Sequence, residues 1–214
     1  MPEYAANTMA LTLYHHPFSR AAGHVWTLEE VGVPYELAFV DFAKGEHKTP
    51  AHLALNPMGK IPVLVDGETV VTEGAAIALY LADRYAAGRL APALDDPRRG
   101  TYLRWALFAP SVIEPGAIAK LNGWAAKPSQ VGWGEFDAVL AAIDRALAPG
   151  PYLLGDTFSM ADVVFGGTLG FMRRFNMLAA SPAVVAYTDR LAERPAYQRA
   201  EARNAAIIKE RGLG

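Results

Sequence analysis

The sequence contains no cysteine among its 214 residues. This absence excludes disulfide bonds, thiolate metal sites and any mechanism that uses a protein cysteine as nucleophile. Charge of one sign is also scarce, because the formal net charge at pH 7 is −2. Such a balance gives no field that would attract nucleic acid or an anionic membrane, so we expect neither among the partners.

Long apolar runs and targeting signals are missing as well. No apolar run is long enough to span a bilayer, and the opening MPEYAANTMA lacks the basic start and apolar run of a secretory signal. We therefore expect a cytoplasmic protein, with the residues before Leu11 forming a short flexible lead-in. Its 52% hydrophobic and 20% charged residues are typical of a globular protein with a substantial core.

The sequence also lacks the common metal and nucleotide motifs. His15 and His16 are adjacent, so on a strand they would point to opposite faces. His47 and His52 do not have the spacing that lets two ligands converge on a helix. No Walker loop, GxGxxG or GxSxG motif occurs. We expect no metal, no nucleotide site and no hydrolase of the GxSxG type.

The first 85 residues alternate between strand and helix patterns. Ala21, Val25 and Leu28 have helical spacing, and Gly32 follows as a stop signal. Asp66-Gly67 is a favoured two-residue turn between two β-rich runs. The predicted elements are a strand over Leu11–Tyr14, a helix ending at Gly32, a strand within YELAFVDF, a loop with one short helical turn, strands over Ile61–Val65 and Glu68–Thr72, and a helix over Glu73–Tyr85.

The second half of the chain reads as helix throughout. The stretch AAGRLAPALDDP is rich in proline, glycine and small residues and indicates a domain boundary. We predict a mixed α/β domain over residues 10–88 and an all-helical domain over residues 96–214. Within the latter, Ser159 and Asp162 have the spacing of a helix N-cap and its partner acid, a structural role that we favour over a catalytic one.

Three polar stretches could carry chemistry. Ser19 and Glu73-Gly74 each lie between a predicted strand and a predicted helix, where free N–H groups and the helix dipole favour an anion. Ser19 could donate its hydroxyl to a negative ligand atom or only cap its helix. Glu73 could hold an ammonium group or only suit the dipole. Lys48 and Lys60 could bind a carboxylate or lie in solvent.

Taken together, the stretches PFSRAAG, GEHKTPAHLALNPMGKIPVLVDGE, TEGAAIALYLADRY and GDTFSMADV resemble the cytosolic glutathione S-transferases. The resemblance covers nearly the whole chain and is closest to serine-type classes, especially phi- and theta-like bacterial members. It implies a thioredoxin-like N-terminal domain of order β-α-β-α-β-β-α, an all-α C-terminal domain and a homodimer.

The resemblance also implies roles for individual residues near the reacting sulfur. Ser19 matches the serine whose hydroxyl donates to the sulfur of glutathione, and Tyr14 is the nearest alternative hydroxyl. Pro62 opens a predicted strand although proline cannot donate a ladder hydrogen bond. It matches a cis-proline, and Ile61 before it would offer its backbone to the ligand as an added strand.

The remaining glutathione-binding positions map onto polar residues with one departure. His47 and Lys48 match positions that bind the glycyl carboxylate, and Lys60 stands where the family often has glutamine. Glu73 matches the acid that holds the γ-glutamyl end. Gly74 departs from the pattern, because this position is usually a serine that donates to the γ-glutamyl carboxylate. We therefore expect weakened glutathione binding.

The implied activity is conjugation of the glutathione thiolate, as co-substrate, to small hydrophobic electrophiles, a detoxification reaction. Because the chain has no cysteine, disulfide reduction through a protein–glutathione mixed disulfide is excluded. Peroxidase, isomerase and dehalogenase activities stay open, as does a non-catalytic glutathione-binding or regulatory role. The electrophile itself is not identified by the sequence. Candidates for its apolar pocket, any of which could instead be core, are Trp105, Phe108, Ile113, Phe171 and Phe175.

Overall fold

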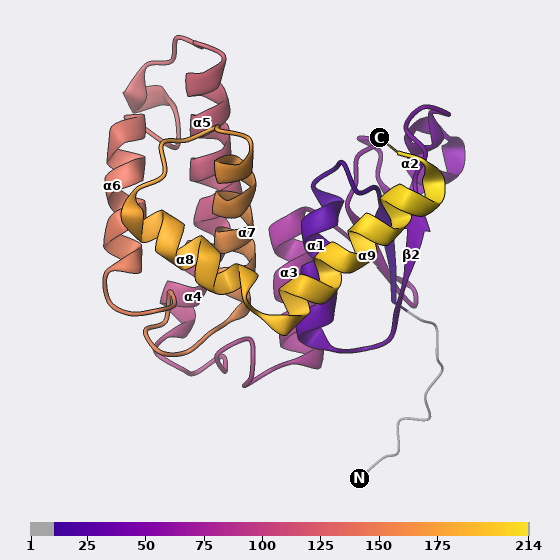
Figure 1. The fold of residues 1–214 in the computed structure, drawn as a ribbon, viewed down its shortest axis with the longest axis horizontal. Helices are drawn as coiled ribbons and strands as arrows, with labels where there is room; N and C mark the ends of the chain where they lie inside the picture. The colour runs from indigo at the N-terminus through magenta and orange to yellow at the C-terminus, as the bar shows by residue number, and fades with distance from the viewer. Residues whose placement is uncertain (1–10, 214) are drawn as a thin grey trace.

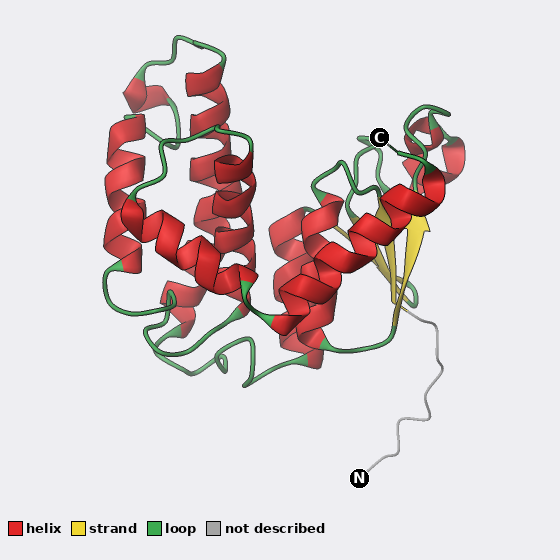
Figure 2. Cartoon of the chain, in the orientation of Figure 1, coloured by secondary structure: helices red, strands yellow, loops and turns green. Residues whose placement is uncertain are grey.

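The computed structural model describes residues 11–213 and has two parts (Figures 1 and 2). A four-stranded sheet with helices comes first in the chain, and a bundle of helices follows. This arrangement confirms the predicted thioredoxin-like domain followed by a helical domain. The lead-in expected before Leu11 lies outside the described residues, as does the first residue of the expected N-terminal domain.

The sheet has the strand order β2-β1-β3-β4. Strand β1 is parallel to β2 and antiparallel to β3, and β3 is antiparallel to β4. Leu13 and Leu64 are register partners in the two central strands, and both are fully buried. Strand bounds agree with the predicted ones to within two residues: β1 is Leu11–His15, β2 Tyr35–Phe39, β3 Val63–Asp66 and β4 Thr69–Thr72.

Two helices of the first domain pack against each other and against the sheet, α1 (Ala21–Val31) and α3 (Gly74–Tyr85). Helix α1 ends at Gly32, whose φ of 78° is left-handed backbone that favours glycine. The polar loop after β2 contains a 3-10 turn over Glu46–Lys48 and the short helix α2 (Pro50–Leu55). The sequence predicted one short helical turn in this loop.

The helical part is built around α7, which contacts α4, α8 and also α3 of the first domain. From Arg98 onward, the described residues contain no strand beyond isolated bridges at residues 152–157, as predicted. One π-helical turn, Ala109–Ile113, joins α4 to α5. The helices are α4 (Arg99–Phe108), α5 (Glu114–Leu121), α6 (Phe136–Leu147), α7 (Met160–Arg174) and α8 (Pro182–Ala192), with a 3-10 turn at Pro128–Gln130.

The last helix, α9 (Pro195–Arg211), leaves the bundle and runs along α1 (Figure 1). The indole ring of Trp26 on α1 packs edge-on against Tyr197, with ring centroids 5.1 Å apart. Asn204 Oδ1 lies 2.8 Å from Nε2 of His15 at the end of β1. The end of the chain therefore supports the first domain.

The start of α7 confirms the predicted N-cap. Asp162 Oδ2 accepts hydrogen bonds from Ser159 N–H at 2.9 Å and Ser159 Oγ at 3.0 Å. Its other oxygen accepts from Leu153 N–H at 2.8 Å and from the Tyr187 hydroxyl at 2.9 Å. Asp162 is fully buried, and burial raises the pKa of its carboxyl despite these four donors. Its role is structural.

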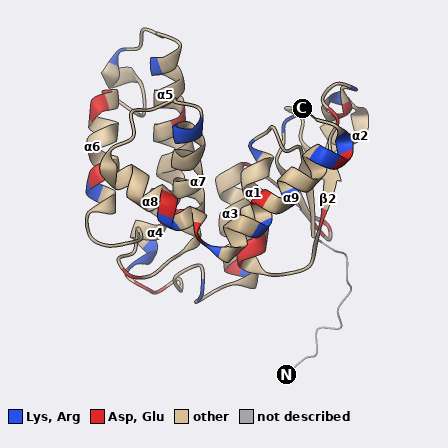
Figure 3. Ribbon diagram, viewed as in Figure 1, with Lys and Arg blue, Asp and Glu red and all other residues tan. Residues whose placement is uncertain are grey.

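Residues of both charge signs are interspersed along the ribbon of the two parts (Figure 3). Some join them, such as Arg99 on α4, whose guanidinium lies 2.6 Å from the Asp83 carboxylate on α3. None of the helices within residues 11–213 has the length and apolar character needed to cross a membrane.

Candidate active site

Three chain segments meet at one end of the sheet because of its register. Tyr14, near the end of β1, pairs with Val63, the first residue of β3. Val63 in turn pairs with Thr72, the last residue of β4. The segments after β1, before β3 and after β4 therefore emerge together. They carry three of the predicted site residues: Ser19, Pro62 and Glu73.

Ser19 occupies the turn between β1 and α1 and is partly exposed. Its hydroxyl donates to the His16 carbonyl at 2.8 Å and accepts from Ala21 N–H at 3.1 Å, so it helps to cap α1. The same carbonyl also accepts from the Ser19 backbone N–H at 3.1 Å. The hydroxyl hydrogen can therefore turn to a ligand without leaving that carbonyl unpaired.

The loop before β3 is held from behind by two buried polar side chains. Asn56 Nδ2 donates to the Lys60 carbonyl at 3.0 Å, and His52 Nε2 lies 3.2 Å from the same oxygen. The Ile61–Pro62 peptide bond is cis, as the resemblance implies. Both ladders of β3 begin at residue 63, so the Ile61 backbone lies beyond them.

A second loop brings basic residues toward this one. Lys48 Nζ donates to the Met58 carbonyl at 3.0 Å, and the His47 ring packs edge-on against Phe42 with centroids 5.1 Å apart. Gly59 makes the approach possible, because a Cβ there would lie 2.7 Å from the His47 carbonyl oxygen and from Lys48 Nζ. The neighbouring Lys60 side chain is exposed.

The start of α3 forms the third side of the site. Glu73 is exposed and has φ 65° and ψ 117°, a strained backbone conformation for a residue with a side chain. Gly74 follows as the first helical residue, and the ring of His24 from α1 fills the space beside its Cα. Sequence reasoning missed His24, because no local pattern links it to residue 74.

The apolar residues predicted for a second substrate lie in two places. Trp105 and Ile113 are buried in the helical core, and Trp105 packs edge-on against Phe108 with centroids 5.2 Å apart. Phe171 and Phe175 form a ring pair near the end of α7, with centroids 4.7 Å apart, and the Phe175 side chain is 58% exposed.

An arginine connects the second pair to the serine. Arg20, the neighbour of Ser19, places its guanidinium 3.9 Å from the centroid of Phe171. It also pairs with Glu114 at the start of α5, at 2.6 Å. The structure thus brings Phe171 to the side of the Ser19 turn, across the boundary between the two parts of the chain.

His15 lies beneath this end of the sheet. Its side chain is fully buried, and burial lowers its pKa to about 4, although the contact with Asn204 opposes the shift. The imidazole is therefore neutral at pH 7. Among the described residues, no cluster of three or more His, Asp or Glu side chains is placed to hold a metal ion.

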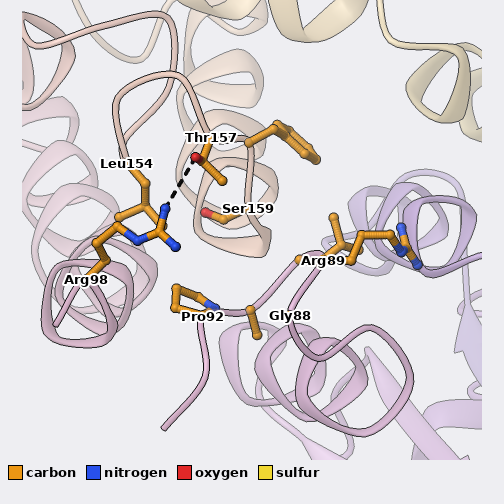
Figure 4. A pocket seen from close by; sticks show the side chains of 10 residues that line it. Gly88, Arg89, Pro92, Arg98, Leu154, Thr157 and Ser159 are labelled. Atoms are coloured by element: carbon orange, nitrogen blue, oxygen red, sulfur yellow. Dashed lines mark hydrogen bonds between the residues drawn. The ribbon is translucent and has the colours of Figure 1, made fainter. Parts of the chain in front are cut away.

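One small pocket lies elsewhere, where the segment after α3 meets the segment before α7 (Figure 4). It is lined by residues that include Gly88, Pro92, Arg98 and Thr157, and Arg98 Nη1 donates to Thr157 Oγ1 at 3.4 Å. Its volume of about 20 Å³ is room for one water molecule. It is too small to hold an organic substrate.

Comparison with known proteins agrees with this geometry. Residues 9–83 match the glutathione S-transferase N-terminal domain, and residues 115–190 match the C-terminal domain. The chain is 30% identical to Glutathione S-transferase F10 of Arabidopsis thaliana, over 91% of this chain and 98% of that protein. The chain belongs to the glutathione S-transferase family. Glutathione S-transferase 3 of Zea mays is 34% identical, over 88% of this chain and 92% of the maize protein.

Solved structures of glutathione transferases share the whole fold. The transferase URE2P6 of Phanerochaete chrysosporium, in complex with oxidized glutathione, superimposes with a TM-score of 0.76 at 30% identity, over 92% of this chain and 97% of its own. The theta class enzyme of Xanthomonas axonopodis pv. citri, with glutathione bound, gives 0.71 at 32% identity, over 89% and 96%. The resemblance seen in the sequence motifs is thereby confirmed for the family.

Proposed function

We propose that the chain is a glutathione transferase in which Ser19 stabilises the thiolate of glutathione for attack on small apolar electrophiles. The observation that carries this proposal is the convergence of the Ser19 turn, the Ile61–Pro62 bond and the Glu73-Gly74 helix start at one end of the sheet. Family membership supplies the ligand, since relatives of known structure hold glutathione or its oxidized form.

The energy that the reaction requires is within reach of this arrangement. A free thiol has a pKa of about 8.5, and the thiolate is the nucleophile. Lowering that pKa by about 2 units takes about 2.7 kcal/mol of differential stabilisation. A charge-assisted hydrogen bond contributes about 1.5–3 kcal/mol, and the N-terminus of α1 beside Ser19 adds a favourable dipole.

The peptide parts of glutathione have matching groups on the loops. The Ile61 backbone, free of the β3 ladders, pairs with the cysteinyl unit as an added strand. His47, Lys48 and Lys60 supply positive or hydrogen-bonding groups for the glycyl carboxylate. The exposed Glu73 carboxylate receives the γ-glutamyl ammonium group.

The second substrate lies between the Ser19 turn and the helical part. Phe171, Phe175 and Phe108 provide apolar surface, while Trp105 and Ile113 are buried in the helical core. With an aryl halide, the thiolate sulfur forms a bond to the ring carbon and the halide leaves as an anion. The thiol proton goes to solvent when glutathione binds as thiolate.

The wider proposal follows the family. Residues 10–88 bind glutathione, residues 96–214 supply the electrophile surface, and the protein works as a cytoplasmic homodimer. The support is the family match of each half and the placement of Phe171 beside the Ser19 turn.

The test is a pair of measurements on the full chain. Isothermal calorimetry should detect glutathione binding, and the purified protein should accelerate thioether formation between glutathione and an activated aryl halide or an enone. Binding without acceleration across such electrophiles would favour a non-catalytic glutathione-binding protein. Absence of binding would contradict both readings.

A further inference from the structure

A side chain on the first residue of α3 would have to displace the ring of His24. A Cβ added to Gly74 would lie 2.5 Å from Nε2 and 3.1 Å from Cε1 of His24. The first distance is well inside van der Waals contact, so the imidazole occupies the volume that a side chain at residue 74 would need. Helix α1 supplies this ring, and α1 and α3 pack against each other.

Nε2 of the imidazole lies on the side that faces Gly74. Burial lowers the pKa of His24 to about 4, so the ring is neutral at pH 7 and carries one N–H. Thr27 Oγ1 lies 3.4 Å from Nδ1, a weak contact that suits a hydroxyl donating to Nδ1. We take the ring hydrogen to be on Nε2, for which no hydrogen-bond partner occurs within residues 11–213.

We propose that His24 Nε2–H binds the α-carboxylate of the γ-glutamyl group and takes the place of a side-chain donor at residue 74. The proposal rests on the proposed function, because it assumes that glutathione places this end at the start of α3. A hydroxyl-bearing side chain on residue 74 would take the volume that the His24 ring occupies and would push the ring aside. Gly74 keeps its own N–H and the helix dipole for the same carboxylate.

This assignment changes the effect on glutathione binding that is expected from Gly74. The glycine alone would weaken glutathione binding, since one charge-assisted hydrogen bond is missing. With His24 in place, the donor is restored from a different helix. The start of α3 then offers a carboxylate the Gly74 N–H and the His24 ring, while Glu73 stands beside it for the ammonium group.

The test compares two ligands by calorimetry at pH 7. One is glutathione, and the other is 4-aminobutyryl-cysteinylglycine, which lacks only the γ-glutamyl α-carboxylate. The variants are His24→Ala, His24→Phe, which fills the space without a donor, and His24→Gln, which keeps a donor. Gly74→Ser is made alone and combined with His24→Ala. Circular dichroism melting checks that each variant is folded.

We expect His24→Ala and His24→Phe to raise the Kd for glutathione about tenfold while changing the Kd for the analogue little. His24→Gln should recover part of the loss. Gly74→Ser alone should weaken glutathione binding because its Cβ collides with the ring, whereas the double variant H24A/G74S should approach the wild type.

Two results would overturn the inference alone. In one, the wild type binds glutathione and His24→Phe binds it equally well, which makes the ring a packing group. In the other, both ligands lose the same affinity, so the effect does not pass through the carboxylate. If the wild-type protein fails to bind glutathione at all, the proposed function fails, and the inference fails with it.

Discussion

Two helix starts in this protein are built in opposite ways. At the start of α7, the buried Asp162 accepts four hydrogen bonds from its own chain. At the start of α3, Glu73 is exposed on strained backbone, and His24 Nε2 beside Gly74 has no hydrogen-bond partner within residues 11–213. The first start pairs its acidic side chain within the protein, and the second leaves its acidic side chain exposed.

Whether the acidic residue at a helix start is paired within the protein or exposed distinguishes a structural role from a binding role better than residue type does. Both helix starts carry an acidic residue, and the free N–H groups at each of these two N-termini favour an anion. At α7 the chain itself meets this demand inside the core, so the carboxylate stabilises the fold. At α3 the same demand faces solvent on the end of the sheet where the Ser19 turn and the Ile61–Pro62 bond emerge.

The largest loss of stability should come from removing Asp162, the acceptor of the four hydrogen bonds at the start of α7. Asp162→Ala leaves three donor groups and the Tyr187 hydroxyl without their acceptor in the core, which should cost about 4 kcal/mol of unfolding free energy. Urea denaturation measures this loss. Asp156→Ala, which removes an exposed acid from the same segment, should change stability by less than about 0.5 kcal/mol.

The stability contributed by His15, which lies below the candidate active site, should depend on pH. The pKa of His15 is about 4 in the folded protein, against an ordinary value of 6.5 for histidine, so folding favours the neutral ring. Its contribution is present above pH 6.5 and is lost as the pH falls, reaching a loss of about 3 kcal/mol at pH 4. Denaturation of wild type and His15→Gln between pH 7.5 and 4 should show a flatter slope for the variant; equal slopes would contradict the buried neutral state.

The catalytic role of Ser19 in the candidate active site should be tested by substitution. Ser19→Ala removes the hydroxyl and should lower kcat/KM for conjugation about 10²-fold, equivalent to about 2.7 kcal/mol, with a small change in the Kd for glutathione. Steady-state kinetics with an activated aryl halide measures it. Ser129→Ala, at an exposed serine of the helical part, is the matched control. An unchanged rate in Ser19→Ala would exclude Ser19 as the activating group.

The smallest effect sharpens the comparison most. Glu73→Gly should relieve the positive φ and raise the unfolding free energy by about 1 kcal/mol, while weakening glutathione binding. Glu68→Gly, at an exposed position outside the left-handed region, should instead be neutral or destabilising. If Glu73→Gly lowered the unfolding free energy, the positive φ of Glu73 at the start of α3 would not destabilise the fold, and the link between strain and binding would be contradicted.

Features that depend on neighbours in the chain could be predicted from the sequence. Gly32 ends α1, and Ser159 with Asp162 starts α7, each as the local pattern indicates. The hairpin turn was predicted one residue too early, because Asp66 pairs with Thr69 and the two turn residues are Gly67 and Glu68. Their signals are short because the hydrogen bonds involved join residues a few positions apart.

Features that depend on how helices pack against each other could not be predicted from the sequence. The approach of His24 to Gly74 is set by the packing of α1 on α3, and the contact of Asn204 with His15 spans most of the chain. The apolar candidates show the same limit, since Trp105 is buried and Phe175 is exposed although both fit an apolar pattern. Composition gave no means to separate them.

The most direct test of the account is the ionisation of the glutathione thiol on the protein. Thiolate absorbance is followed against pH with and without saturating protein, for the wild type and for Ser19→Ala. Thiolate activation by Ser19 predicts a pKa about 2 units below that of the free thiol in the wild type and a return toward about 8.5 in the variant. Glutathione that binds with an unshifted thiol pKa would contradict thiolate activation and leave Ser19 as the cap of α1.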